Sequence, residues 1–204
     1  MTDVLKKYES IVDLKDNNLP IIFLFHGTGA DNTDLIPIAK HLNPTASIIS
    51  VNGNVFVNGA RRYFDRNMYG VDVEDLKFRA KELATYLEAL IKEHQIEKQK
   101  KIAIGYSNGA NIIIGMLQQH TKIFDGVGLL HGAPYSEDKY QDVSGLHVYV
   151  SLGENDQMID ATQTMKMVKD LDESEAKVTV FSHQQGHHMT TQEIDALKTW
   201  FESI

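Results

Sequence analysis

The segment at residues 105–109, Gly-Tyr-Ser-Asn-Gly, constrains the fold of this chain more than any other. The short run at 101–104 before it is typical of a strand, and residues 110–117 after it are typical of a buried helix. A strand, a G-x-S-x-G turn and a helix together form a nucleophile elbow, which has no room for bulky side chains two residues before or after the serine. Such a turn lifts the Ser107 hydroxyl above the sheet and points the first helical amides toward it. The alternative is a glycine-rich turn with a surface serine.

Six segments with strand character alternate with helical segments, and they cover residues 19–25, 46–51, 101–104, 124–130, 147–152 and 177–181. Continuous apolar runs of this kind are typical of parallel strands covered on both faces. We therefore predict an α/β fold with a mostly parallel central sheet and helices on both faces. A length of 204 residues favours a single domain spanning 1–204. Only residues 130–146 separate two of the strands, so we expect no large lid domain and an open site.

Several polar residues predict where turns and helices begin. Asp72 is the predicted cap of the helix that follows it, and Thr190 with Glu193 has the spacing of a capping box. Residues 32–34, Asn-Thr-Asp, are candidate caps for the helix that continues to residue 42. Residues 16–18, Asp-Asn-Asn, predict a turn.

Charge and composition exclude several classes of partner. The chain has 20 basic and 28 acidic residues and a formal net charge of -8, which argues against nucleic acid as the main partner. No apolar run approaches the ~20 residues that a membrane span requires. The first residues lack the apolar core of a signal peptide, and the chain has no cysteine, so we expect a cytoplasmic protein. A homodimer is left open as an assembly.

An elbow serine needs a base, because a hydroxyl is a weak nucleophile at neutral pH, and the base needs an orienting carboxylate. In this kind of fold these groups follow one another in the order serine, acid, histidine, on loops after the strands. Asp156 lies in the loop after 147–152, with Glu154 as the competing acid. His187 follows the last strand, with His188 as the competing base. The predicted catalytic residues are therefore Ser107, Asp156 and His187.

Two backbone amides are predicted to form an oxyanion hole. The N–H of Thr28 follows the first central strand, and the N–H of Asn108 follows the serine, so both can face a developing negative charge. Four side chains are predicted to contact the substrate, namely Tyr63 and Phe64 in the long segment 52–71, and Met158 and Ile159 after the acid.

Other polar residues have less defined roles. His26 is interpreted as a buried structural histidine. His131 either reaches the site or is a loop histidine whose hydrogen bonds are satisfied, and the second reading is favoured. Arg61 and Arg62 are either a solvated pair or part of a loop that closes over the acyl or leaving group. The histidines at 183, 187 and 188 lack a carboxylate at metal-ligand spacing, so we predict neither a metal nor a cofactor.

Taken together, these motifs resemble the phospholipase/carboxylesterase family of α/β-hydrolases, and most of all the small bacterial carboxylesterases of the hydroquinone-resistance type. The resemblance runs from about residue 19 to the C-terminus. It rests on Phe25-His26-Gly27-Thr28-Gly29, Arg61-Arg62-Tyr63-Phe64-Asp65, Gly105-Tyr106-Ser107-Asn108-Gly109-Ala110, Gly153-x-x-Asp156 and Gly186-His187-x-Met189-Thr190. It implies the α/β-hydrolase fold, a Ser107, Asp156, His187 triad and ester hydrolysis without a cofactor.

The function predicted from the sequence is a serine carboxylesterase that hydrolyses small to medium acyl esters through an acyl-enzyme. A lysophospholipase or acyl-protein thioesterase is the alternative within the same chemistry, and it would need a long apolar groove. A non-hydrolytic module that binds a small molecule on the same fold is the alternative of another class. Dienelactone-type enzymes with a cysteine nucleophile are excluded because the chain has no cysteine.

Overall fold

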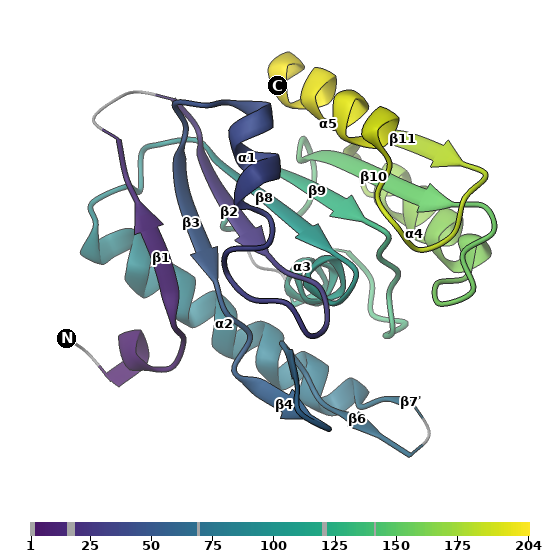
Figure 1. Cartoon of the computed structure of the whole chain (residues 1–204), viewed down its shortest axis with the longest axis horizontal. Coiled ribbons are helices and arrows are strands. Elements are labelled where there is room, and N and C mark those ends of the chain that lie inside the picture. The colour runs from purple at the N-terminus through teal and green to yellow at the C-terminus, as the bar shows by residue number, and fades with distance from the viewer. Residues whose placement is uncertain (1–2, 16–18, 69, 120–121, 141) are drawn as a thin grey trace.

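The centre of the molecule is a seven-stranded sheet in the order β1-β3-β2-β8-β9-β10-β11 (Figure 1). The computed structural model describes residues 3–15, 19–68, 70–119, 122–140 and 142–204, so the turn predicted at 16–18 lies outside the described residues. The strands are β1 (Ser10–Asp13), β2 (Ile21–Phe25), β3 (Ser47–Val51), β8 (Lys101–Tyr106), β9 (Gly126–Leu130), β10 (His147–Gly153) and β11 (Lys177–His183). Only the edge strand β1 pairs antiparallel with its neighbour, which confirms the predicted mostly parallel sheet.

In the part of the chain that the structure describes, five α-helices cover the two faces of this sheet. They are α1 (Ile36–Leu42), α2 (Val73–Glu93), α3 (Asn108–Gln118), α4 (Ala161–Glu173) and α5 (Thr191–Ser203), and a short 3-10 helix, η1 (Asp3–Lys6), precedes β1. Helices α1 and α5 share one buried apolar cluster, whereas α2, α3 and α4 share the other. Figure 1 shows α1 and α5 in front of the sheet and α2 and α3 behind it. The prediction of helices on both faces is therefore confirmed.

Strand β2 explains why the sequences of the central strands are continuous apolar runs. All five of its side chains are fully buried. Ile21, Phe23 and Phe25 belong to the cluster beneath α2 and α3, while Ile22 and Leu24 belong to the cluster beneath α1 and α5. Because alternate side chains point to opposite faces and both faces are covered by helices, no position in the strand needs a polar residue.

The segment between β3 and α2 folds into two short hairpins. Strand β4 (Val55–Val57) pairs with β5 (Ala60–Arg62), and β6 (Arg66–Asn67) pairs with β7 (Gly70–Val71). The chain between them is anchored by Tyr63, whose hydroxyl donates to the Val51 carbonyl at 2.6 Å. These hairpins are small, and within the described residues no large lid covers the ends of the central strands (Figure 1).

Two of the three predicted helix starts are confirmed. Asp72 accepts the Asp75 N–H at the start of α2, and Thr190 with Glu193 forms a complete capping box at the start of α5. The caps predicted at 32–34 are wrong, because α1 begins after Leu35 without a side-chain cap. Thr33 belongs to the preceding turn instead, where its backbone N–H and its hydroxyl donate to Oδ1 of Asp31 at 2.8 Å and 2.6 Å.

No helix in the described part of the chain has both the length and the apolar character needed to cross a membrane.

Candidate active site

The turn between β8 and α3 has the geometry of a nucleophile elbow. Ser107 adopts φ 52° and ψ -111°, a conformation that is rarely populated by residues other than glycine. A Cβ at Gly105 would lie 2.5 Å from the Gly109 carbonyl oxygen, and a Cβ at Gly109 would lie 1.9 Å from the Phe25 carbonyl oxygen. Both glycines are therefore required by close backbone contacts, one within the turn and one between the turn and the end of β2.

Ser107 lies at one end of a chain of three side chains. Nε2 of His187 lies 2.8 Å from Oγ of Ser107, and Nδ1 of His187 lies 2.6 Å from Oδ2 of Asp156. Because Asp156 is an acceptor, the proton of a neutral imidazole belongs on Nδ1, which leaves Nε2 free to accept the serine hydroxyl. The structure thus brings the three predicted catalytic residues into hydrogen-bonding contact.

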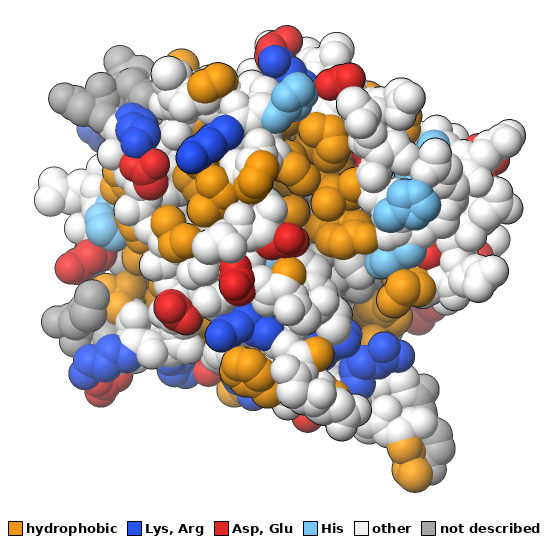
Figure 2. Space-filling model, viewed as in Figure 1, with side chains coloured by type: hydrophobic (Ala, Val, Ile, Leu, Met, Phe, Trp, Pro, Cys, Tyr) orange, Lys and Arg blue, Asp and Glu red, His pale blue; other side chains and the backbone are white. Residues whose placement is uncertain are grey.

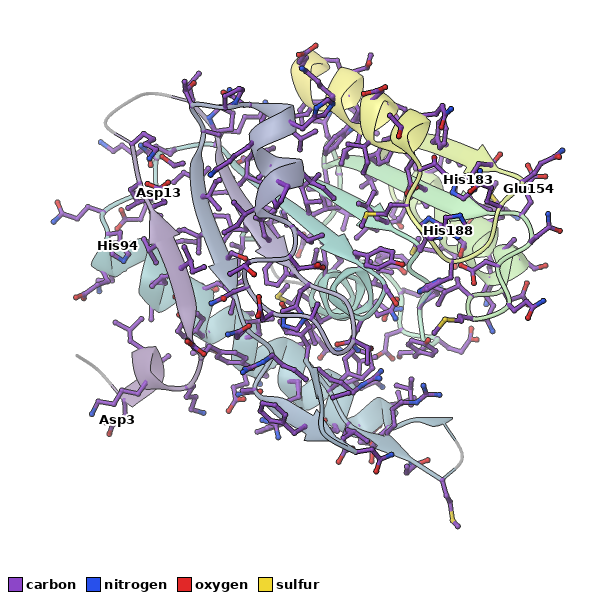
Figure 3. All side chains as sticks on the ribbon, in the orientation of Figure 1. Asp3, Asp13, His94, Glu154, His183 and His188 are labelled. Atoms are coloured by element: carbon purple, nitrogen blue, oxygen red, sulfur yellow. The ribbon has the colours of Figure 1, made fainter. Side chains whose placement is uncertain are left out.

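Asp156 is held by backbone donors from its own loop. Its Oδ1 accepts the N–H of Met158 at 2.8 Å and the N–H of Ile159 at 3.0 Å. Burial alone would raise the pKa of Asp156, but the hydrogen bond from His187 and these two amides leave that pKa lowered. The competing acid Glu154 is exposed and accepts the Ser182 hydroxyl instead (Figure 3).

The loop after β11 carries His187 toward the elbow. A Cβ at Gly153 would lie 2.4 Å from the Gly186 carbonyl oxygen, so the missing side chain at Gly153 allows this loop to approach the acid loop. The Tyr106 hydroxyl donates to the His187 carbonyl, which fixes the backbone of the histidine. His188 is exposed and its Nε2 lies 2.5 Å from Oε1 of Gln185, away from the serine.

The two residues of the predicted oxyanion hole both line the same cleft as His187. Thr28 is exposed, whereas Asn108 is buried and its Oδ1 accepts the Tyr63 N–H at 2.8 Å. The Asn108 side chain therefore has a role of its own, since it ties the elbow to the segment between the hairpins. His26 is buried as predicted, and its Nε2 accepts the Gly53 N–H at 3.0 Å.

The cleft beside Ser107 has a volume of about 440 Å³. It is lined by Thr28, Arg62, Arg66, Asn108, Asn111, Tyr135, Gln157, Met158, Ile159 and His187. None of these residues is acidic, and neither arginine forms an ion pair with any residue that the structure describes. Arg62 is 9% exposed, and its Nε has no hydrogen-bond partner among those residues. Figure 2 shows basic side chains gathered at the base of the β6–β7 hairpin.

The predicted substrate contacts need one correction. Met158 and Ile159 line the cleft, but Tyr63 and Phe64 are 1% and 0% exposed and lie in the hydrophobic core. The reason is that the chain between β5 and β6 turns these rings inward. The residues that line the cleft from this segment are instead Arg62 and Arg66, which the sequence pattern did not single out as a pair.

His131 is a second feature, and the reading of it that the sequence disfavoured is the one that fits the structure. It is completely buried behind the triad, and its Nδ1 lies 3.3 Å from Oδ2 of Asp156. Its Nε2 lies 3.3 Å from Oε2 of Glu193, which is also completely buried. Burial alone would lower the pKa of His131, but hydrogen bonds and charges from Glu193 and then Asp156 leave that pKa raised.

Among the described residues, two sets of side chains have donor atoms close enough to hold a metal ion. They are His131, Asp156 and His187, and His131, His183 and Glu193, and in each set the donor atoms lie within 4.8 Å of one another. The first set is already linked by hydrogen bonds that include the candidate base. In the second set, Glu193 also accepts the Thr190 N–H and the Ser151 hydroxyl.

Residues 67–196 match the model of the dienelactone hydrolase family. The chain belongs to this family. It is also 31% identical, over 89% of its length and 92% of the other protein, to MhqD of Bacillus subtilis (strain 168), which carries the name of a hydrolase. The exclusion of dienelactone-type enzymes therefore concerns only a cysteine nucleophile, since this member has Ser107 at the elbow and no cysteine.

Solved structures extend this relationship to the fold. A Bacillus cereus carboxylesterase superposes with a TM-score of 0.92 at 32% identity and covers 99% of both chains. A structure of YahD with malic acid superposes with a TM-score of 0.91 at 27% identity, over 96% of this chain and 98% of that one. The predicted resemblance to α/β-hydrolase carboxylesterases is confirmed, and the protein is an ester hydrolase.

The close contact at Gly109 predicts a large effect of one methyl group. We expect Gly109→Ala to lower the free energy of unfolding by at least about 3 kcal/mol, because the added Cβ would overlap the Phe25 carbonyl and the backbone would have to move. Gly186→Ala is the matched control, since its Cβ would meet only the Asn155 carbonyl oxygen at 3.7 Å. Urea unfolding measures both changes, and equal stability of the two variants would contradict this account of the elbow.

The buried groups behind the triad predict how stability depends on pH. The lowered pKa values of Asp156 and Glu193 stabilise the fold above their ordinary values of 3.8 and 4.5, and this contribution is lost as the pH falls through the lowered values. The raised pKa of His131 stabilises the fold fully below 6.5, and this contribution is lost as the pH rises through the raised value. From these groups we expect the largest free energy of unfolding between pH 4.5 and 6.5.

Urea unfolding across pH, on the native chain and two variants, checks this expectation. Glu193→Gln should flatten the pH dependence, because it removes one carboxylate and one partner of His131. Glu154→Gln, which changes an exposed carboxylate, should leave the shape of the curve unchanged. A Glu193→Gln curve parallel to that of the native protein would contradict the assignment.

Proposed function

We propose that this ester hydrolase is a serine carboxylesterase in which Ser107 is the nucleophile, His187 the general base and Asp156 the residue that orients the base. The observation that carries the proposal is the pair of distances from His187, 2.8 Å to the serine oxygen and 2.6 Å to the aspartate oxygen. A nucleophile and base within hydrogen-bonding reach, with the base oriented by a third group, is the general requirement for acyl transfer by a hydroxyl.

The reaction has two steps. Ser107 Oγ attacks the ester carbonyl while its proton moves to His187 Nε2, and that proton then passes to the departing alcohol as the acyl-enzyme forms. Water then attacks the acyl-enzyme and loses a proton to His187. That proton passes to Ser107 Oγ as the Ser107 Oγ–acyl bond breaks, which releases the acid and restores the serine hydroxyl. Protonated His187 cannot act as a base, so activity should fall at acid pH.

The negative charge on the carbonyl oxygen is proposed to be stabilised by the backbone N–H groups of Thr28 and Asn108. Both residues line the cleft, and Asn108 is the first residue of α3, where amides have no partner within the helix. The partial positive charge at the start of the helix adds to this stabilisation. Removing one such donor typically lowers the rate by about 10²–10³.

The cleft favours a small ester that carries a negative charge. The chain is acidic overall, with a net charge of -8, yet its cleft contains Arg62 and Arg66 and no acidic side chain. An unpaired, largely buried arginine is a strong site for a carboxylate, because both the charge and the planar N–H groups find a partner. The structure of YahD with malic acid supports this choice, since malic acid is a small carboxylic acid. A long acyl chain fits this lining less well, which disfavours the lysophospholipase and thioesterase alternative.

The absence of cysteine is consistent with the proposed cytoplasmic location, where disulfides are rarely used.

Labelling of the serine tests the proposed nucleophile. A fluorophosphonate probe should add one phosphonyl group to the native chain and none to Ser107→Ala, as measured by intact mass. Ester hydrolysis by Ser107→Ala should fall by at least about 10³-fold, because the remaining groups can only bind and polarise the ester. Ser182→Ala, which changes a hydroxyl on the outer strand β11, should keep both labelling and activity. Unchanged labelling of Ser107→Ala would refute the nucleophile.

Matched esters test the preference for negative charge. We expect Arg66→Gln to lower kcat/KM for p-nitrophenyl hydrogen succinate by about tenfold, or about 1.4 kcal/mol, because it removes a charged donor from the cleft. The same variant should change kcat/KM for p-nitrophenyl butyrate by less than about twofold. Arg61→Gln is the control, since Arg61 lies outside the lining and donates to the Gly53 carbonyl at 3.0 Å. An equal loss on both esters would contradict the charge preference.

A further inference from the structure

Behind the triad, a second histidine joins two buried carboxylates. His131 follows β9 and lies between Asp156 and Glu193, with 3.3 Å from each ring nitrogen to a carboxylate oxygen. The side chains of His131, Asp156 and Glu193 are 0%, 2% and 0% exposed. His131 also adopts φ 50° and donates its backbone N–H to the Ser151 carbonyl at 3.0 Å, so its position is fixed by the surrounding strands.

The partners of the two carboxylates favour the ionised form of both. Asp156 accepts two backbone N–H groups and His187, in addition to its contact with His131. Glu193 accepts the Ser151 hydroxyl and the Thr190 N–H, in addition to its contact with His131. Apart from the Ser151 hydroxyl and the two histidine rings, which can donate or accept, these partners are donors. Burial alone would raise the pKa of both carboxyls, but their hydrogen bonds leave both pKa values lowered.

The other groups around this cluster do not supply a second positive charge. His183 Nδ1 accepts the Gln185 N–H at 3.2 Å, so its remaining proton belongs on Nε2, which lies 3.5 Å from Oε2 of Glu193. The Tyr106 ring packs against both His131 and His187, and its hydroxyl is used by the His187 carbonyl. The Tyr149 hydroxyl donates to the backbone carbonyl of Glu193.

A neutral His131 cannot satisfy both of its neighbours. One of its ring nitrogens would carry a lone pair and would face a carboxylate oxygen that also carries lone pairs. Both contacts are attractive only when Nδ1 and Nε2 each carry a proton, which makes the ring an imidazolium. A single positive charge between two buried carboxylates also offsets the free-energy cost of burying both of them without a counter-charge.

We propose that His131 is a positioning residue, a buried imidazolium that donates to Glu193 on one side and to Asp156 on the other. It thereby fixes the Asp156 carboxylate in the orientation that receives the N–H of His187. The buried chain runs from Glu193 at the start of α5 through His131, Asp156 and His187 to Ser107, and it joins α5 to the elbow. This inference rests on the proposed function, because it assigns to His131 the role of orienting Asp156, a member of the proposed triad.

The arrangement has a consequence for the chemical step. Asp156 shares one oxygen, Oδ2, between the two histidines, while its other oxygen is held by backbone amides. Its charge is therefore partly balanced by His131 before the reaction starts. Loss of the imidazolium would leave His187 facing a less compensated carboxylate, which favours protonated His187. Because His131 lies outside the cleft lining, its loss should not weaken substrate binding.

The protonation state of His131 can be measured directly in the native protein. Side-chain ¹⁵N NMR, assigned with a His131→Asn variant, should show protons on both ring nitrogens of His131 at pH 6. Asparagine is chosen because it tolerates the left-handed backbone at this position. Glu193→Gln, which keeps a capping-box residue, should lower the pH at which one of these protons is lost. A single ring proton on native His131 at pH 6 would overturn the proposal.

Kinetics test the link to the triad. We expect His131→Asn to lower kcat by about tenfold or more with KM within about twofold, and to move the acid limb of kcat/KM upward by about one pH unit. Tyr149→Phe is the matched control, because it removes another buried hydrogen bond at Glu193 but leaves the chain intact, so its acid limb should not move. If His131→Asn raised KM and left kcat unchanged, or if its acid limb did not move, the proposal would be overturned.

Two further results distinguish this proposal from a metal site at His131 and from a failure of the proposed nucleophile. Stoichiometric metal in the isolated protein, bound to His131, His183 and Glu193, would overturn it, because a metal on Nε2 excludes a proton there. Phosphonate labelling that survives in Ser107→Ala would refute the proposed nucleophile instead, while the NMR result for His131 would stand independently.

Discussion

The contact between the end of β2 and the first turn of α3 is the constraint on which the site depends. With a Cβ at Gly109 only 1.9 Å from the Phe25 carbonyl oxygen, any side chain there would force strand and helix apart. Their approach brings the start of α3 beside the loop that carries Thr28, so one contact sets both the position of Ser107 and the distance between the two proposed oxyanion donors. The strained backbone of Ser107 is tolerated because the buried strands on either side determine it.

A second close approach, at the other end of the site, brings the acid and base together. Strands β10 and β11 are neighbours, and they remain in register up to Gly153 and His183. The following loops can meet only because Gly153 has no side chain, and their contact brings Asp156 to His187. Two pairs of adjacent parallel strands therefore deliver three side chains that are far apart in sequence to one edge of the sheet.

Most features encoded over a few residues could be predicted, with the caps at 32–34 as the exception, whereas features that depend on the direction of a side chain could not. The elbow, the cap at Asp72 and the capping box at Thr190 each have a local signal, and their geometry follows from it. Tyr63 and Phe64 were assigned to the substrate because aromatic residues in a long segment often line a site. Whether the ring or the neighbouring arginine faces inward depends on hairpins β4–β5 and β6–β7, and neither apolar periodicity nor turn residues specify that choice.

His131 illustrates the same limit for electrostatics. In sequence it is a lone histidine after an apolar strand, and nothing nearby distinguishes it from a histidine with an ordinary backbone partner. Its partners lie 25 and 62 residues away, on the acid loop and at the start of α5. Glu193 had a sufficient local explanation as a capping-box residue, yet the same carboxylate also faces His131 and Ser151. A buried carboxylate needs more hydrogen-bond donors than one helix start provides, so a fully buried capping glutamate is a reason to look for a cation beside it.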